Sequence, residues 1–196
     1  AIDGLEKKQP DKPLAAQLRG RTLLAKKDIA GARKNFERAL AIDPSYFQAV
    51  ASLAGLDMAD NKPDEAKKRF EAVLTREPKN SQALLALAEL AARSGAAKEE
   101  VSKLIGKAVS ASPTDVLPHL LLIDFNLRNQ DVKAASSAAQ NAVAALPGSP
   151  ELLDALGRTQ QASGDYNQAI ASYNKLAGLQ PLLPQPHLRL AEVHMA

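Results

Sequence analysis

Residues 150–181 read PELLDALGRTQQASGDYNQAIASYNKLAGLQP, and this stretch decides the fold. Two halves with helical spacing meet at the breakers at 163–165, which are Ser-Gly-Asp. The second half places three residues at spacings of four and three, on one helix face: Ala169, Tyr173 and Leu176. Because Pro181 cannot continue a helix, the stretch predicts a helix, a tight turn and a second helix.

The same pattern recurs along the chain. Successive prolines lie 34, 34, 35, 34 and 34 residues apart: Pro10, Pro44, Pro78, Pro113, Pro147 and Pro181. In register with them, a small residue, once replaced by isoleucine, recurs in each first half: Gly20, Ala54, Ala88, Ile123, Gly157 and Ala191. The pattern predicts helices near residues 13–26, 29–42, 46–59, 63–76, 81–94, 98–112, 116–129, 132–146, 150–163, 166–179 and 184–195. Helix pairs at this period bury their faces against neighbouring pairs, which predicts a solenoid and not a globule.

The composition agrees with packing by small side chains. Of the 196 residues, 45% are hydrophobic but only 4% are aromatic, so few large side chains are available to centre one globular core. The absence of cysteine excludes disulfides, thiolate zinc sites and cysteine nucleophiles. Neither a signal peptide nor a run of about eighteen apolar residues is evident, so we expect no membrane contact by this segment.

The order of small, aromatic and proline positions resembles the tetratricopeptide repeat family, whose unit has 34 residues. Residues 13–44 and 150–181 follow the family pattern closely, whereas residues 81–115 carry one extra residue near Ala96. The aromatic residue that the family has early in its first helix is replaced here by Ala16, Val50, Leu84, His119, Leu153 and His187. The resemblance implies an all-α superhelix, an α-solenoid of antiparallel helix pairs.

We expect a single array over residues 1–196, with five full repeats and a partial unit at each end. Residues 1–12 end a preceding repeat, and the full repeats are 13–46, 47–80, 81–115, 116–149 and 150–183. Residues 184–196 form the first helix of a truncated repeat. Three of its residues are expected to face a second helix that the segment lacks, which favours weak end-to-end self-association: Leu188, Leu190 and Val193.

The resemblance also implies that first helices line a concave groove, which binds a peptide or a partner segment. The groove-facing candidates are Gln17, Arg21, Leu24, Gln48, Met58, Gln82, Leu85, Glu89, Arg93, Leu117, Leu120, Asp124, Leu127, Arg128, Asp154, Arg158 and Gln161. A carboxylate clamp, found in some family members, is not expected, because its positions hold Gln17, Arg21, Ser52 and Ala86. Leucines beside arginines suit an amphipathic helix or an apolar segment with acidic flanks, although the same leucines could simply pack between helices.

No set of residues predicts catalysis, a cofactor or a metal site. His119 and His187 stand at packing positions, and His194 lacks a tight metal-binding spacing. Three acidic residues lie on first helices of different repeats and do not form an acid-base pair: Glu89, Asp124 and Asp154. Nucleotide-binding and hydrolase motifs are absent. We therefore expect a non-catalytic protein-protein interaction scaffold, with a glycan-processing enzyme as the competing class.

An RNA-binding helical repeat is the other alternative, because helical repeats of similar length can read single-stranded RNA, although the net charge of +3 is too small to argue for nucleic acid on its own. Residues 1–80 hold sixteen basic and twelve acidic residues, whereas residues 81–196 hold nine and ten. The basic clusters at 33–38 and 67–69 lie on second helices, the outer face of this architecture, and glutamates are interleaved with them. Stacking aromatic residues are missing from the inner face. We expect a protein or peptide partner and no nucleic acid.

Residues 152–196 carry a narrower resemblance, through the segments LLDALGR, ASGD and KLAGLQP. They resemble repeats of a bacterial tetratricopeptide lipoprotein family that is associated with PEP-CTERM protein sorting and exopolysaccharide gene clusters. This resemblance implies a periplasmic or outer-membrane-anchored scaffold in exopolysaccharide export or PEP-CTERM sorting, with a lipidated cysteine outside these residues. A cytoplasmic protein is the alternative.

Overall fold

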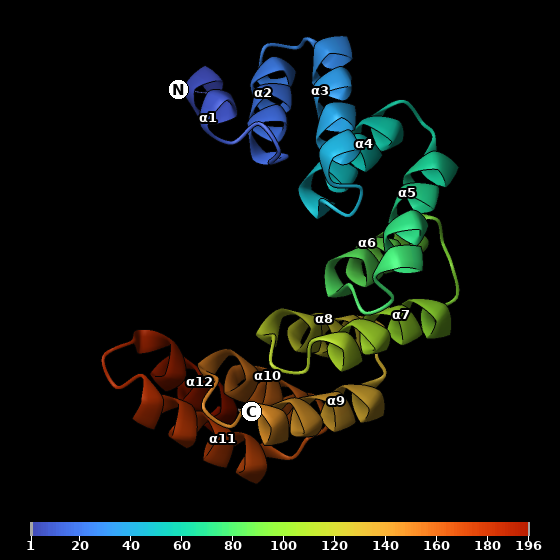
Figure 1. Ribbon diagram of the computed structural model, residues 1–196. Helices are drawn as coiled ribbons and strands as arrows, with labels where there is room; N and C mark the ends of the chain where they lie inside the picture. The colour runs from blue at the N-terminus through green and yellow to red at the C-terminus, as the bar shows by residue number, and fades with distance from the viewer. Residues whose placement is uncertain (1, 196) are drawn as a thin grey trace. The chain divides into compact units, whose positions relative to one another are not determined.

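The computed structural model describes residues 2–195, apart from the side chain of Asp3, and every regular element in this part of the chain is an α-helix. The chain divides into two compact units, Ala1–Ser94 and Gly95–Ala196, which we call unit 1 and unit 2. Unit 1 holds α1 (Ile2–Lys8), α2 (Leu14–Ala25), α3 (Ile29–Ile42), α4 (Phe47–Ala59), α5 (Pro63–Arg76) and α6 (Ser81–Arg93). Unit 2 holds α7 (Lys98–Ala111), α8 (Val116–Arg128), α9 (Val132–Ala145), α10 (Pro150–Ala162), α11 (Tyr166–Leu179) and α12 (Pro184–His194) (Figure 1). None of the helices within residues 2–195 combines the length and hydropathy that crossing a bilayer requires.

The helices predicted from the 34-residue period are confirmed within one residue at each end. Side-chain oxygens cap several first turns by accepting a hydrogen bond from the backbone N–H three residues on: Asp28, Asn80, Asp131 and Ser149. Consecutive helices pack as pairs, α2 with α3 and α4 with α5 in unit 1, and α8 with α9 and α10 with α11 in unit 2. The predicted all-α fold of antiparallel helix pairs is therefore confirmed within each unit.

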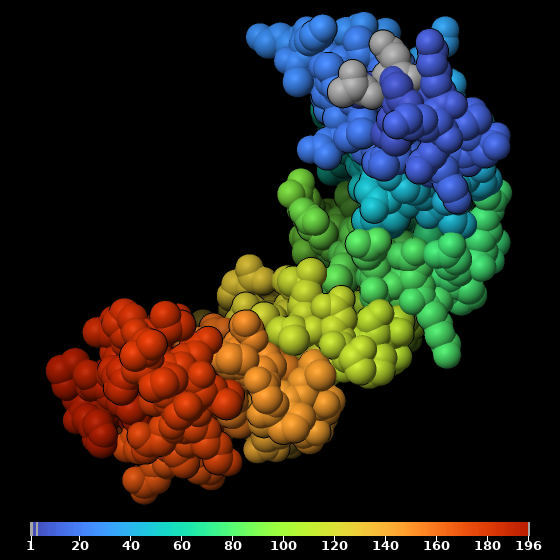
Figure 2. Space-filling view, turned by 60° about the vertical axis from the view of Figure 1, so that its left-hand side comes forward, coloured from blue at the N-terminus to red at the C-terminus, as the bar shows by residue number. Residues whose placement is uncertain are grey.

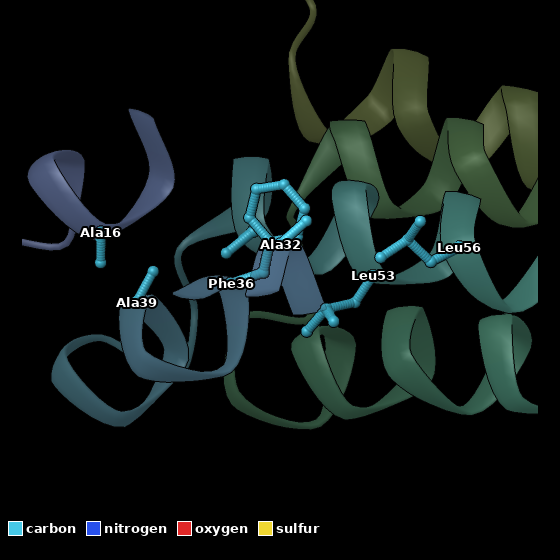
Figure 3. Close-up of a cluster of buried hydrophobic side chains, with 7 residues drawn as sticks. Ala16, Ala32, Phe36, Ala39, Leu53 and Leu56 are labelled. Carbon is cyan, nitrogen blue, oxygen red and sulfur yellow. The ribbon is translucent and has the colours of Figure 1, made fainter. Parts of the chain in front are cut away.

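In unit 1 a glycine on the first helix lets an aromatic ring approach the backbone of that helix. A Cβ atom at Gly20 would overlap the ring of Phe36, and Phe36 is fully buried. The ring belongs to a cluster from α2, α3 and α4, formed by Ala16, Ala32, Phe36, Ala39, Ala49, Leu53 and Leu56. Figure 3 shows Ala16 of α2 and Ala39 of α3 directed toward one another. Small residues thus allow two helices to cross closely, while one large ring fills the space at the crossing.

Unit 2 contains the same crossing twice, once with the sizes of the two residues exchanged. Gly157 faces the ring of Tyr173, which is fully buried. Burial, together with the charge of Asp154, raises the pKa of Tyr173 to about 12, so the ring stays neutral at physiological pH. In the preceding repeat the corresponding pair, also sixteen residues apart, is Ile123 and Ala139, both fully buried in one cluster. The large side chain now comes from the first helix, and the pair still fills the crossing.

A buried carboxylate joins three helices of unit 1. Asp57 on α4 is only 3% exposed, and its oxygens accept hydrogen bonds from Arg33 of α3, at 2.7 Å, and from Arg69 of α5. Arg33 also pairs with Asp60 at 3.0 Å. Burial alone would raise the pKa of Asp57, but the hydrogen bonds from Arg69 and Arg33 outweigh it and hold the pKa below its usual value of 3.8. Two arginines of the second helices are therefore engaged inside unit 1.

Unit 1 is expected to lose stability in acid because of Asp57. A carboxyl whose folded-state pKa is lowered stabilises the fold above its unfolded pKa of 3.8, and this contribution disappears as the pH falls through the folded-state value. Asp57→Asn should lower the free energy of unfolding at neutral pH by about 1–3 kcal/mol. The variant should also lose less stability than the wild type between about pH 5 and pH 3. Urea unfolding at several pH values measures both effects, and an unchanged pH dependence in the variant would contradict this account.

The last helix corrects one prediction. We expected Leu188, Leu190 and Val193 of α12 to face a missing second helix, but Val193 is only 4% exposed. It is buried in a cluster with residues of α10 and α11, against which Leu190 also packs: Leu153, Tyr173 and Leu176. The reason is that α12 lays this face on the preceding helix pair, which leaves Leu188 exposed. Figure 2 shows the last residues, coloured red, at the surface of unit 2. End-to-end self-association stays a prediction.

Candidate functional site

The first helices of unit 2 are joined by a continuous chain of ion pairs. Arg158 of α10 donates to Asp124 of α8 at 2.9 Å and to Asp154 of its own helix at 3.1 Å. Arg189 of α12 donates to the other oxygen of Asp154 at 2.9 Å and to Glu192 at 3.2 Å. We call these five residues the first-helix ladder. Because each arginine spans two carboxylates, the ladder holds α8, α10 and α12 in register.

The centre of the ladder is partly withdrawn from water. The side chain of Asp154 is 15% exposed and accepts from both arginines, so its two oxygens are both engaged. Burial alone would lower the pKa of Arg189, but the hydrogen bonds that Arg189 donates to Asp154 and Glu192 outweigh it and raise the pKa above its usual value. Isolated surface ion pairs contribute about 0–1 kcal/mol each, whereas a shared and partly buried carboxylate couples its partners. The ladder therefore links the first helices α8, α10 and α12 through shared ion pairs.

A cleft of about 310 Å³ opens beside the first-helix ladder. It is lined from α8 by Leu120 and Asp124, from α10 by Pro150, Glu151, Asp154 and Arg158, and from α11 to α12 by Leu176, Gln180, Leu183 and Gln185. Leucines and a proline supply apolar surface, and charged and amide side chains supply polar groups. A cleft of this size, with apolar surface and a few polar groups, is typical of a site that receives one or two side chains of a ligand.

Glu151 adds a fixed negative charge to this cleft. The hydroxyl of Ser149 donates to Glu151 Oε2 at 2.7 Å, and this hydrogen bond, followed by that of the Glu151 backbone, lowers the pKa of Glu151. The residue also lies in the first turn of α10, where the helix dipole favours an anion. Among residues 2–195, no basic side chain pairs with Glu151. Its carboxylate is therefore available to pair with a cationic group of a ligand.

Four groove candidates predicted for this part of the chain line the cleft: Leu120, Asp124, Asp154 and Arg158. Leu127 instead packs on the buried cluster around Ile123, and Leu120 does so as well as lining the cleft. Arg128 is exposed, and its Nε donates to the carbonyl oxygen of Asp124 at 3.2 Å. Leu120 thus combines the two roles that the sequence left open, whereas Leu127 shows packing alone, and contact of either with a ligand stays a prediction.

Apart from Gln17, eight candidates lie in unit 1, and four of them are exposed: Arg21, Leu24, Gln48 and Gln82. Met58 and Leu85 are half-buried. Within residues 2–195, the one ion pair among the eight joins the remaining two, Glu89 and Arg93, at 2.6 Å along α6. These side chains belong to three different helices, and their role in binding stays a prediction.

Gln17 corrects another prediction, because it is 5% exposed instead of facing the groove. Its Nε2 donates to Ser52 Oγ at 3.1 Å and to the carbonyl oxygen of Gln48 at 3.3 Å, which joins α2 to α4. Its Oε1 is buried without a partner among the described residues. The packing of successive first helices turns this position inward, so a polar side chain there serves the contact between repeats.

None of the three histidines, all of which lie within residues 2–195, lines the cleft of unit 2. His119 is 6% exposed, and its Nε2 lies 3.0 Å from the carbonyl oxygen of Pro113, which confirms that it packs. His187 and His194 are exposed. Within residues 2–195, histidine, aspartate and glutamate side chains form no group of three or more that could hold a metal ion.

Among the residues beside the cleft that sequence reasoning missed are Glu151, Leu183, Gln185 and Arg189. Glu151 and Gln185 stand 34 and 68 residues after Leu117, which was a groove candidate, so extending that register would have found both. Leu183 lies in the loop between α11 and α12, outside any helical register. Arg189 stands one period after the fully buried Ala155, so only the structure shows that it reaches Asp154.

Three family models, each described as tetratricopeptide repeat, match residues 23–70, 52–116 and 150–181. Yeast Tom70 has 17% sequence identity and a TM-score of 0.73 over 99% of this chain, which spans 42% of Tom70. TTC0263, a TPR protein of Thermus thermophilus, has 21% identity and a TM-score of 0.58, covering 94% of this chain and 100% of that protein.

YrrB, described as a TPR protein with an unusual peptide-binding site, has 15% identity and a TM-score of 0.58. The match covers 100% of this chain and 98% of YrrB. At these identities the likeness shows the fold alone. A search of curated proteins found no relative. The family models, the helix pairs and the 34-residue period agree, and the chain belongs to the tetratricopeptide repeat family.

Proposed function

We propose that the protein is an interaction scaffold, and that the cleft beside the first-helix ladder of unit 2 binds a segment of a partner protein. The observation that carries the proposal is the cleft itself, about 310 Å³, which combines apolar lining with polar groups from α8, α10 and α12. Tetratricopeptide repeat proteins are generally non-catalytic scaffolds, and YrrB, a structure of similar fold, is described as having a peptide-binding site.

The ladder supports this proposal because it makes the cleft rigid before binding. Arg158 connects α8 to α10, and Arg189 connects α10 to α12, so the walls cannot separate without breaking ion pairs. A preformed site avoids the free-energy cost of ordering side chains when the ligand arrives. Leu183 is 48% exposed at this site and offers apolar contact to a bound segment.

The competing classes have less support from the site. Of the two aspartates at this site, Asp154 has both oxygens engaged by arginines and Asp124 has one, which leaves Glu151 as the one cleft carboxylate without a basic partner among residues 2–195. In unit 1, Arg33 and Arg69 are bound to Asp57, so they are not available as a track for RNA phosphates.

The test is a peptide-array screen with the purified protein, followed by affinity measurements on two matched variants. Leu183→Gln removes apolar surface from the cleft without adding a charge, whereas Leu182→Gln makes the same change at the adjacent residue, which is 94% exposed and does not line the cleft. We expect peptides selected by the wild type to bind Leu183→Gln about tenfold more weakly and Leu182→Gln equally well. Equal affinities for all three proteins, with matching circular dichroism spectra, would place the binding surface elsewhere.

We infer the compartment and pathway from the resemblance of residues 152–196 alone. The proposal is a periplasmic or outer-membrane-anchored scaffold in exopolysaccharide export or PEP-CTERM sorting. Fractionation of cells that produce the full-length protein tests the compartment, and recovery only in the cytoplasm would reject it. Sedimentation velocity over a range of concentrations tests the proposed weak self-association.

A further inference from the structure

We infer that the cleft of unit 2 selects a peptide segment in which a lysine or arginine is flanked by apolar side chains. This inference rests on the proposed function and adds the chemical class of the partner segment. It differs from the sequence-based expectation of an apolar segment with acidic flanks, and the difference comes from how the arginines are used in the structure.

The arginines beside the cleft are already neutralised. Arg158 holds Asp124 at 2.9 Å and Asp154 at 3.1 Å, and Arg189 holds Asp154 at 2.9 Å and Glu192 at 3.2 Å. To bind an acidic side chain, Arg158 would have to give up one of two existing ion pairs. The exchange would replace one carboxylate with another and leave an aspartate unpaired, so it offers little net gain.

The carboxylates, in contrast, outnumber the basic groups. Together, the first-helix ladder and Glu151 hold four carboxylates, Asp124, Glu151, Asp154 and Glu192, against two guanidinium groups, Arg158 and Arg189. Glu151 has no basic partner among residues 2–195, and Arg158 contacts only one oxygen of Asp124, whose side chain is 39% exposed. A cation that enters the cleft therefore meets uncompensated negative charge and displaces no existing pair.

The apolar lining explains why the cation should be carried on a peptide side chain. Leu120 and Leu176 lie on the helical walls, and Leu183 lies on the loop before α12. Lysine and arginine combine an aliphatic stem with a charged end, so the stem can lie along the leucines while the charge meets the carboxylates. Gln180 and Gln185 provide amide groups in the same cleft, which can pair with the backbone of an extended segment.

The experiment measures fluorescence anisotropy with labelled, amidated peptides of alternating leucine and alanine that carry one central lysine, glutamine or glutamate. We expect the lysine peptide to bind the wild type about tenfold more tightly than the glutamate peptide, with the glutamine peptide between them. Higher salt should reduce this ratio, because the selectivity is electrostatic.

Glu151→Gln removes the unpaired charge of the cleft, and Glu99→Gln makes the same charge change on α7, at an exposed residue that does not line it. We expect Glu151→Gln to reduce the preference for lysine over glutamate about threefold to fivefold, and Glu99→Gln to leave it unchanged. Equal reductions in both variants would mean that the net charge of the protein, and not the cleft, sets the preference.

The outcomes separate this inference from the proposed function. If the peptides bind and Leu183→Gln weakens their binding, but glutamate is accepted as well as lysine, the inference is wrong and the scaffold proposal stands. If no peptide binds the wild type, and the peptides selected on the array are insensitive to Leu183→Gln, the proposed function of this cleft is itself rejected.

Discussion

Phe36→Ala is expected to lower the free energy of unfolding of unit 1 by about 3–5 kcal/mol. The ring is fully buried, lies against the backbone of Gly20, and contributes to the cluster that joins α2, α3 and α4. Removing it leaves a cavity that neighbouring alanines are too short to fill. A domain of this size has a total stability of about 5–15 kcal/mol, so the loss takes a large share.

Chemical denaturation followed by far-ultraviolet circular dichroism measures the loss, and hydrogen exchange locates it. Protection should decrease in α2, α3 and α4. Phe47→Ala is the matched control, because Phe47 is half-buried and its ring centroid lies 6.0 Å from that of Phe70. We expect this control to lose about 1–2 kcal/mol. Equal losses in the two variants would contradict the central role of the Phe36 ring.

Gly157→Ala is expected to destabilise unit 2 by about 1–3 kcal/mol or more, although alanine favours helices. The added methyl group would overlap Cε1, Cζ and Cδ1 of Tyr173, and that ring is fully buried. The matched control is Gly178→Ala in α11, where a Cβ atom would meet nothing within 4 Å. The control should raise the free energy of unfolding by about 0.4–1 kcal/mol, so the same substitution has opposite signs at two helical sites of one unit.

A second substitution identifies the cause of the loss. Tyr173→Leu removes Cε1 and Cζ, two of the three atoms that the added methyl group would overlap, and is destabilising by itself because the ring is lost. Combined with Gly157→Ala, it should cost less than the sum of the two single changes, since the added methyl group then occupies vacated space. Strict additivity in thermal or urea unfolding would show that the glycine does not act through this ring.

The period of the prolines was enough to place the helices, because a solenoid repeats the same helix-turn-helix unit along the chain. Each pair needs a breaker between its helices, a stop after the second helix and a close helix crossing, so one clear unit such as residues 150–181 describes the others. The predictions that Gln17 faces the groove and that Val193 faces a missing helix were wrong, because both depend on which way a helix face turns toward its neighbour. That direction is set by helix crossing, which a one-dimensional spacing does not specify.

The candidate site could be predicted only in part for the same reason. Leu120, Asp124, Asp154 and Arg158 fall at helical positions with a regular register, and the sequence identifies them. The pairing of Arg158 with two carboxylates depends on side-chain reach between repeats, and this pairing is the reason that we infer a basic and not an acidic partner segment.

The exchange of sizes between Ile123 and Ala139 affects how such a repeat is recognised from its sequence and which substitutions it tolerates during evolution. Family models match residues 23–116 and 150–181, and the repeat that carries the exchange lies between these ranges. A model that scores each column separately penalises isoleucine where it expects a small residue, and penalises alanine where it expects a ring. The crossing constrains the combined volume of the two columns, so mutational drift can move bulk from one helix to the other through paired substitutions. Scoring the two columns jointly would therefore detect a diverged repeat that single-column scoring overlooks.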